Sequence, residues 1–269
     1  MLRIAVHGAA GRMGRRVVAL ATEDPAVRLL AAVERDGHPA LGQDAGVLAG
    51  VGDLGVCLAD TWPSEIDAVI DFSLPDAVDL VVGKAVQTKT ALVMATTGLT
   101  AAHHAALRAA SEKIAIVWAP SMSLAVNLSM RLAQQAAKSL RDVHGGVDIE
   151  VIERHHRFKE DAPSGTALRF GELLAETIRE TTGTTTVQHV HGRQGNTGAR
   201  QSHQIGYHAI RSGDNPGEHT IVFGMLGETI ELKVAASNRD CYASGAVTAA
   251  KWLAGKSHGL YSMFDVLGL

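Results

Sequence analysis

The sequence predicts an α/β protein of two domains, an N-terminal doubly wound parallel sheet followed by a smaller α+β domain with a mixed sheet. Through residue 118, short apolar runs alternate with helical patterns, which is typical of parallel sheets. A glycine-rich turn follows the first apolar run. Beyond residue 186 the chain changes to segments in which polar and apolar residues alternate, a pattern of sheets with one covered face.

The elements can be assigned in order along the chain. In the first domain we expect strands at residues 3–7, 28–33, 68–72, 91–95 and 114–118, with helices ending near residues 22, 86 and 112. Residues 36–60 are rich in Gly, Asp and Ala without a period, which predicts a surface loop or weak strands.

The second domain is expected to begin within a long amphipathic helix over residues 124–140. Its strands are predicted at residues 147–152, 187–191, 202–211, 220–226 and 229–236, and its second helix starts near Gly165. A last helix over residues 243–253 is expected to fold back onto the first domain. We therefore expect a dinucleotide-binding domain at 1–127, completed by 238–269, and a substrate-binding and oligomerisation domain at 128–237.

Composition excludes several classes of protein. The net charge of −3 gives no reason to expect a nucleic acid or an anionic membrane as a partner. No apolar run is long enough to span a membrane, and the N-terminus has no signal-peptide pattern, so a cytoplasmic location is expected. The two cysteines and 13 histidines show no metal-ligand spacing and no nearby acidic cluster, so we expect no metal site and no disulfide framework.

The glycine-rich turn Gly8-Ala9-Ala10-Gly11-Arg12-Met13-Gly14 lies between the first strand and the first helix, as in Rossmann-like dinucleotide-binding folds. Gly8 permits a tight turn, Gly11 permits close approach of a pyrophosphate, and Gly14 permits the helix to pack against the strand. The spacing is GxxGxxG rather than GxGxxG, and such turns also occur without a nucleotide.

The second predicted strand ends in Glu34-Arg35, and Glu34 lies 20 residues beyond Gly14. An acidic residue at this position is where the adenosine ribose hydroxyls are expected. A neighbouring arginine can pair with a 2′-phosphate, so the two residues together predict that NADH or NADPH binds. The alternative is that both are solvated charges at a strand end.

Three further turns follow strands of the first domain, at Phe72-Ser73, Ala95-Thr96-Thr97-Gly98 and Ala119-Pro120-Ser121-Met122. Ligands of doubly wound sheets bind beyond the carboxyl ends of the strands, so these turns are candidates for cofactor contacts. Thr96, Thr97 and the Gly98 backbone could bind a nicotinamide carboxamide or ribose. Thr97 could equally be a simple helix cap.

The stretch from Glu153 to Ala167 reads as the end of a strand, a basic loop and the start of a helix. Pro163 forbids helix at the residue before it, and Ser164 can cap a helix that starts near Gly165. His155, His156 and Lys159 therefore stand beside free N–H groups at a helix N-terminus, an arrangement that suits a small anion and a proton donor. Paired histidines on a loop can also be merely solvated.

With both patterns in view, the chain resembles the dihydrodipicolinate reductase family, also called 4-hydroxy-tetrahydrodipicolinate reductases, nearly from end to end. The resemblance rests on the glycine turn, Glu34-Arg35, Thr96-Thr97-Gly98 and, above all, Glu153-x-His155-His156-x-x-Lys159-x-Asp161-Ala162-Pro163-Ser164-Gly165-Thr166-Ala167.

The resemblance implies hydride transfer from NADH or NADPH to a cyclic, conjugated imine dicarboxylate with loss of water, and it suggests a homotetramer. It implies acid–base roles for His155 and Lys159, substrate contacts from His156, Ser164, Gly165 and Thr166, and a basic residue near the substrate carboxylates at Arg239. The cofactor-binding residues expected are Gly8, Ala9, Ala10, Gly11, Arg12, Met13, Glu34, Arg35, Ala95, Thr96, Thr97, Ala119, Pro120, Ser121 and Met122.

The chain departs from the family pattern at two turns on the nicotinamide side. Ala95 stands where the family usually has glycine. Ser121-Met122-Ser123 and Ala125 stand where it usually has Asn-Phe-Ser and a following glycine. The alternatives to this enzyme are a non-catalytic sensor of NAD(P)H and another small NAD(P)-dependent reductase. A sensor would have no need of histidines and a lysine beside an anion-binding turn.

Overall fold

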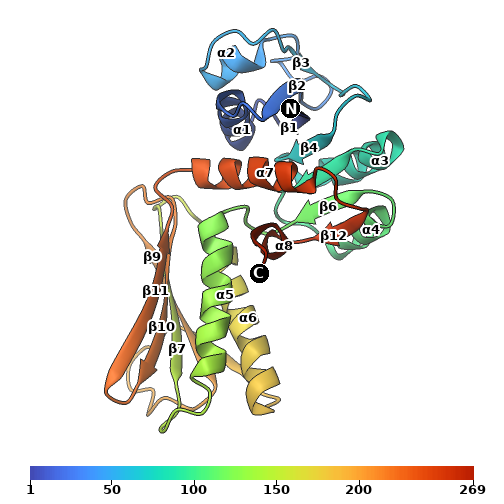
Figure 1. Cartoon of the computed structure of the whole chain (residues 1–269). Helices are drawn as coiled ribbons and strands as arrows, with labels where there is room; N and C mark the ends of the chain where they lie inside the picture. Colours follow the sequence, from blue (N-terminus) through green and yellow to red (C-terminus); the bar gives the residue numbers. More distant parts are fainter. The chain divides into compact units, whose positions relative to one another are not determined.

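The computed structural model describes residues 1–269, which divide into two compact units (Figure 1). Unit 1 comprises residues 1–124 and 239–269, and unit 2 comprises residues 125–238. From the sequence we expect these boundaries at residues 127 and 237. No helix in either unit is both long enough and apolar enough to cross a membrane.

Unit 1 is built on a parallel sheet of seven strands in the order β12-β6-β5-β4-β1-β2-β3. Its strands are β1 Leu2–His7, β2 Val27–Val33, β3 Leu58–Ala59, β4 Ala68–Asp71, β5 Ala91–Met94, β6 Ala115–Trp118 and β12 Gly259–Tyr261. Its helices are α1 Arg12–Glu23, α2 Ala45–Ala49, the 3₁₀ helix η1 Pro75–Ala77, α3 Val78–Thr88, α4 Ala101–Ser111, α7 Asp240–Leu253 and α8 Met263–Leu267.

The central strands of this sheet are apolar without alternation because helices cover both faces. Ile70 of β4 packs into a cluster that includes α1 and α7, whereas its neighbour Val69 packs into a second cluster with α3 and α4. All four residues of β4 are buried. The predicted doubly wound parallel sheet is confirmed.

Unit 2 contains a mixed sheet of five strands in the order β11-β10-β7-β9-β8. The strands are β7 Asp148–His155, β8 Gln188–His191, β9 Gln204–Arg211, β10 Glu218–Met225 and β11 Glu228–Ala235. Helices α5 Leu124–Ser139 and α6 Gly165–Thr182 lie along this sheet (Figure 1). Strand β7 pairs parallel with β9 and antiparallel with β10, so the prediction of a mixed sheet is confirmed.

The interpretation of residues 36–60 as loop or weak strands was incomplete, because this segment contains helix α2 as well as the short strand β3. The Asp44 carboxylate accepts hydrogen bonds from the backbone N–H groups of Gly46, Val47, Leu54 and Val56. One capping side chain therefore organises a glycine-rich segment that has no hydrophobic period. Strand β12 and helix α8, near the C-terminus, were also not predicted.

Strand β7 extends to His155, three residues beyond the predicted end at residue 152. The strand continues because β9 and β10 pair with it through Arg154, and β9 does so as far as His155. These partners lie more than 50 residues away in sequence, so local pattern did not reveal them. The first histidine of the pair is thus fixed in a sheet rather than carried by a loop.

Helix α7 packs within unit 1 and closely approaches an earlier segment at Gly245. A Cβ atom on Gly245 would lie 1.8 Å from the carbonyl oxygen of Met122. Since this obstacle is backbone, the helix can approach the turn after β6 this closely only with glycine at position 245.

We expect Gly245→Ala to lower the free energy of unfolding by about 1–3 kcal/mol, because overpacking forces helix and backbone apart. Gly83→Ala is the matched control, since Gly83 also lies within a helix but a Cβ there would meet nothing within 4 Å. This variant should be neutral or stabilised by up to about 1 kcal/mol. Urea unfolding followed by circular dichroism compares them, and equal stabilities would contradict the proposed contact.

Candidate active site

The glycine turn after β1 can be formed only by residues without side chains at two positions. Gly8 has a φ of +77°, and a Cβ atom there would lie 2.7 Å from the carbonyl oxygen of Phe72. A Cβ atom on Gly14 would lie 2.1 Å from the carbonyl oxygen of Gly8. Gly11 is the N-cap of α1 and gives it no side-chain cap. The first N–H groups of α1 are therefore left for a ligand, as a pyrophosphate requires.

Glu34 ties the end of β2 to this turn. Its Oε1 atom accepts a hydrogen bond of 3.0 Å from the backbone N–H of Ala10, and its Oε2 atom accepts one of 3.3 Å from Arg35. The carboxylate is thus held beside the glycine turn, where ribose hydroxyls would be recognised. The side chain of Arg35 is exposed.

The residues predicted to bind the cofactor gather at one edge of the sheet of unit 1. They follow the carboxyl ends of β1, β2, β5 and β6, and all these strands are parallel. Six of their side chains are buried, those of Ala9, Ala10, Ala95, Thr96, Ala119 and Met122. The apolar residues among them have no side-chain hydrogen-bond donor, so their hydrogen bonds to a ligand would come from the backbone. Arg12, Thr97 and Pro120 are exposed, whereas Met13 and Ser121 are half-buried.

A buried hydrogen-bonded chain, not predicted from the sequence, links three neighbouring strand ends. The Asp71 carboxylate lies 2.6 Å from His7 Nδ1 and accepts a hydrogen bond of 2.6 Å from Thr96 Oγ1. All three side chains are buried. The Thr96 hydroxyl donates its proton to Asp71, so it is not available as a donor to a nicotinamide carboxamide.

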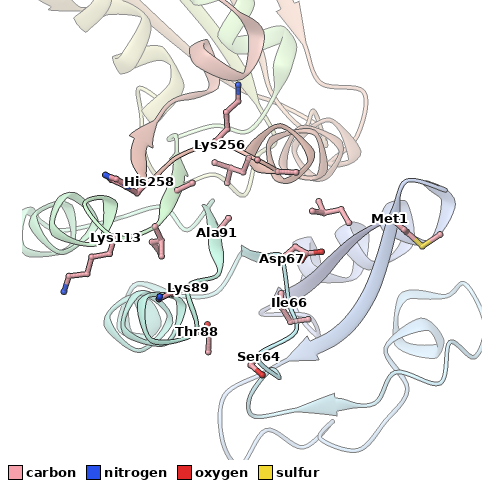
Figure 2. Close-up of a pocket in the computed structure, with 16 residues that line it drawn as sticks. Met1, Ser64, Ile66, Asp67, Thr88, Lys89, Ala91, Lys113, Lys256 and His258 are labelled. Atoms are coloured by element: carbon pink, nitrogen blue, oxygen red, sulfur yellow. The ribbon is translucent and has the colours of Figure 1, made fainter.

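A hollow of about 710 Å³ in unit 1 lies away from these residues (Figure 2). It is lined by the amino-terminal ends of strands, including Leu2, Ala91 and Ala115, and so opens at the opposite edge of the sheet. Figure 2 shows the side chains of Lys113 and Lys256 pointing away from it rather than converging on it. None of the predicted site residues lines this hollow, so we do not consider it the active site.

In unit 2 the site is centred on Glu153 and His155, which lie on the same face of β7. Residues two apart in a strand share a face, and this face is covered, so Glu153 is 1% and His155 8% exposed. His155 Nδ1 lies 2.6 Å from Glu153 Oε2. Because an ionised carboxylate can only accept, Nδ1 carries the proton and donates it.

Arg211 of β9 holds the same carboxylate from the neighbouring strand. Its two terminal nitrogens donate to the two oxygens of Glu153, each at 2.7 Å, and one of them also donates to the carbonyl oxygen of Asp161 at 2.6 Å. Burial alone would raise the pKa of Glu153, but the hydrogen bonds from Arg211 and His155 outweigh it and lower that pKa below its usual value. Glu153 is therefore ionised at neutral pH.

Burial has the largest effect on His155 and lowers the pKa of its imidazole, while the Glu153 carboxylate opposes that effect. The positive charges of Lys159 and Arg211 lower the pKa further. The result is a histidine whose pKa lies below its ordinary value, within a cluster of cationic groups. Such a group can give up a proton readily.

The start of α6 is fixed from two sides. The backbone N–H of Ser164 donates to Glu153 Oε1 at 3.1 Å, and Ser164 Oγ accepts from the N–H of Ala167 as the cap of the helix. The predicted helix start at Gly165 is confirmed. Ser164 Oγ also lies 3.1 Å from Nε2 of the buried His219, whose pKa burial lowers to about 4. His219 is therefore neutral.

The other predicted substrate residues surround this centre in part. Lys159 Nζ donates to both carboxylate oxygens of Asp161, at 2.7 and 2.8 Å. His156 is half-buried, and its Nδ1 atom is buried without a hydrogen-bond partner. Gly165 and Thr166 form the first turn of α6, whose N–H groups have no acceptor within the helix. Arg239 is the N-cap residue of α7 and belongs to unit 1.

Asp71, Glu153, Arg211 and His219 were assigned no role from the sequence. Glu153 stands two residues before His155, which in a strand means the same face, so the spacing alone could have indicated it. Arg211 and His219 reach the site through strand pairing over more than 50 residues, for which the local sequence carries no signal.

Comparison with known proteins covers both units. A family model described as the N-terminus of dihydrodipicolinate reductase matches residues 2–122, and one described as its C-terminus matches residues 125–267. A 4-hydroxy-tetrahydrodipicolinate reductase of Rhodopirellula baltica is 59% identical over 100% of this chain and 96% of its own length. One of Alkalilimnicola ehrlichii is 48% identical over 99% of both.

Among solved structures, a dipicolinate-bound dihydrodipicolinate reductase from Paenisporosarcina sp. TG-14 shares the fold, with a TM-score of 0.73 at 22% identity over 98% of each chain. GenD2 from gentamicin A biosynthesis, solved with NAD, is more distant, with a TM-score of 0.51 at 17% identity over 86% of this chain and 72% of its own. The full-length match to both family models and the identities of the relatives lead to one conclusion. The chain belongs to the dihydrodipicolinate reductase family.

Proposed function

We propose that this chain reduces 4-hydroxy-tetrahydrodipicolinate to tetrahydrodipicolinate with NADH or NADPH and loss of water, in lysine and diaminopimelate biosynthesis. The observation that carries the proposal is the setting of His155. Its Nδ1 atom donates to a buried carboxylate, which leaves Nε2 as the atom for proton transfer. His155 is the last residue of β7, and the loop that follows carries Lys159 and leads to the start of α6.

The residues of unit 1 fit a dinucleotide. The turn at Gly8 has no room for a side chain, and Gly11 leaves the first N–H groups of α1 uncapped, which suits a pyrophosphate. Glu34 beside that turn suits the ribose hydroxyls, and the exposed Arg35 suits a 2′-phosphate. A bound NADH or NADPH supplies the hydride.

The roles proposed for unit 2 follow from charge and proton balance. The overall reaction adds one hydride and one proton and releases one water. His155 supplies the proton from Nε2 and recovers it from solvent, while Lys159, with its cationic Nζ, stabilises negative charge on the substrate or relays the proton. Lys159 pairs with Asp161, and a substrate carboxylate would compete with Asp161 for the ammonium group.

The two carboxylates of the substrate need hydrogen-bond donors. We assign the N–H groups of Gly165 and Thr166 at the start of α6, together with Ser164 and His156, to one end of the substrate. The buried Nδ1 atom of His156, which has no partner in the protein, supports a ligand contact there. Arg239 is assigned to the carboxylates as a cationic donor.

We also infer a homotetramer and a cytoplasmic location. Strand β11 is an edge strand of the sheet in unit 2, and six of its eight residues are exposed, which suits pairing with another copy. A cytoplasmic location follows from the proposed reaction, because it consumes NADH or NADPH.

Replacing His155 or Lys159 with alanine should lower kcat by roughly 10²–10⁴-fold, the range for an acid–base group, while NADH still binds. Steady-state kinetics measures the first effect and the fluorescence of bound NADH the second. The controls are His144→Ala and Lys138→Ala, whose side chains are exposed and lie on the turn after α5 and on α5 itself. Normal turnover in both site variants would remove the acid–base assignment, and absence of turnover in the wild-type chain would favour a sensor of NAD(P)H.

Replacing Arg35 with alanine should raise KM for NADPH by roughly tenfold or more, because a charge-assisted hydrogen bond contributes about 1.5–3 kcal/mol. KM for NADH should change little. Arg28→Ala is the control. Arg28 is also an exposed arginine, but it lies near the start of β2, whereas Arg35 follows its carboxyl end. Equal effects on the two cofactors in Arg35→Ala would show that Arg35 does not bind the 2′-phosphate.

Sedimentation equilibrium should give a mass close to four times the 28.3 kDa of the chain. A monomer mass at micromolar concentration would contradict the tetramer but leave the proposed reaction standing, because turnover is measured separately.

A further inference from the structure

We propose that Glu153, clamped by Arg211, is a positioning residue that fixes the ring orientation and tautomer of His155 so that Nε2 delivers the proton. This inference rests on the proposed function and adds two residues to it that have no assigned role. Neither needs to touch the substrate. Both act through the imidazole of His155.

The geometry leaves His155 one orientation. Its Nδ1 atom lies 2.6 Å from Glu153 Oε2, and the backbone of β7 on which both residues sit is paired on either side. Rotating the ring by half a turn would place a carbon atom against a buried carboxylate and leave that oxygen without one of its donors. The proton on Nδ1 is therefore fixed, and Nε2 is the atom that exchanges protons.

Glu153 can hold the ring because Glu153 itself cannot move. Both its oxygens accept from Arg211, and Oε1 also accepts from the backbone N–H of Ser164. Arg211 is held in turn by the carbonyl oxygen of Asp161. The carboxylate is thus fastened to β7, to β9 and to the first turn of α6, so the position of His155 is set relative to the residues proposed to bind the substrate.

The pKa of His155 depends on the groups that face its imidazole. They are Glu153 on its own strand, Arg211 on β9, His219 on β10, and Lys159 with Asp161 in the loop. Only Glu153 raises the pKa of His155, whereas burial, Lys159 and Arg211 lower it. His219, with a pKa of about 4, stays neutral where the enzyme would be assayed.

The test is Glu153→Gln, assayed as the full-length enzyme from pH 5 to 10. Because the amide has no charge and offers a donor to His155, the falling limb of kcat/KM against pH should move to lower pH by roughly one unit or more. kcat at pH 8 should fall at least roughly tenfold, with KM for NADH unchanged. Glu153→Asp, which keeps the charge but shortens the side chain, should lose kcat with a smaller displacement of the limb.

Glu150→Gln is a matched control. Glu150 lies on the opposite face of β7 and also accepts from arginine, here two residues, Arg193 and Arg200, with His208 Nε2 at 2.7 Å. It should lose stability without any change in kcat or in the pH profile. If Glu153 served stability alone, Glu153→Gln would behave like Glu150→Gln: it would lose stability but keep the wild-type kcat and pH profile.

The outcomes separate this inference from the proposed function. If His155→Ala is inactive but Glu153→Gln keeps the wild-type pH profile and kcat, the positioning role is wrong and the acid–base assignment stands. If His155→Ala is fully active, the acid–base role proposed for His155 is wrong, and with it the positioning role of Glu153. If Glu153→Gln does not fold, Glu153→Asp carries the test, and wild-type kcat in that variant overturns the positioning role.

Discussion

The ion pair between Glu153 and Arg211 is the interaction on which unit 2 depends most. Removing a carboxylate from water costs several kcal/mol, and an unpaired one inside a protein is strongly destabilising. Here four donor groups satisfy it, from the Arg211 guanidinium, the His155 ring and the Ser164 backbone. Because all of them are needed, the end of β7 and the start of α6 are held at fixed positions, and the loop of residues 156–163 between them is anchored at both ends.

Unit 1 also contains a buried carboxylate that links neighbouring segments. Asp71 is fully buried and joins the ends of β1, β4 and β5 through His7 and Thr96. Glu34 joins the end of β2 to the glycine turn through the N–H of Ala10. In both units, acidic side chains connect segments that carry the site but are distant in sequence. Side-chain hydrogen bonds thus add to the backbone pairing of the strands and extend to the turns and helix starts that follow them.

The sequence predicted those features that depend on local order. Apolar periods gave the strands and helices, and Pro163-Ser164-Gly165 located the start of α6, because capping is decided within four residues. It did not predict that β7 reaches His155 or that Arg211 faces Glu153, because these follow from pairing with β9. Likewise, helix α2 depends on four backbone contacts to Asp44, which no periodicity reveals.

The departures from the family pattern at Ala95 and Met122 take on a different meaning once burial is known. The side chains of both residues are directed into the core of unit 1, where Ala95 is 6% and Met122 2% exposed. A change from glycine to alanine or from phenylalanine to methionine there alters packing volume, which flexible methionine tolerates well. The surface that a nicotinamide would meet at these two positions is backbone. Since the Thr96 hydroxyl is held by Asp71, we propose that backbone groups and the exposed Thr97 make the polar contacts to a nicotinamide on this side.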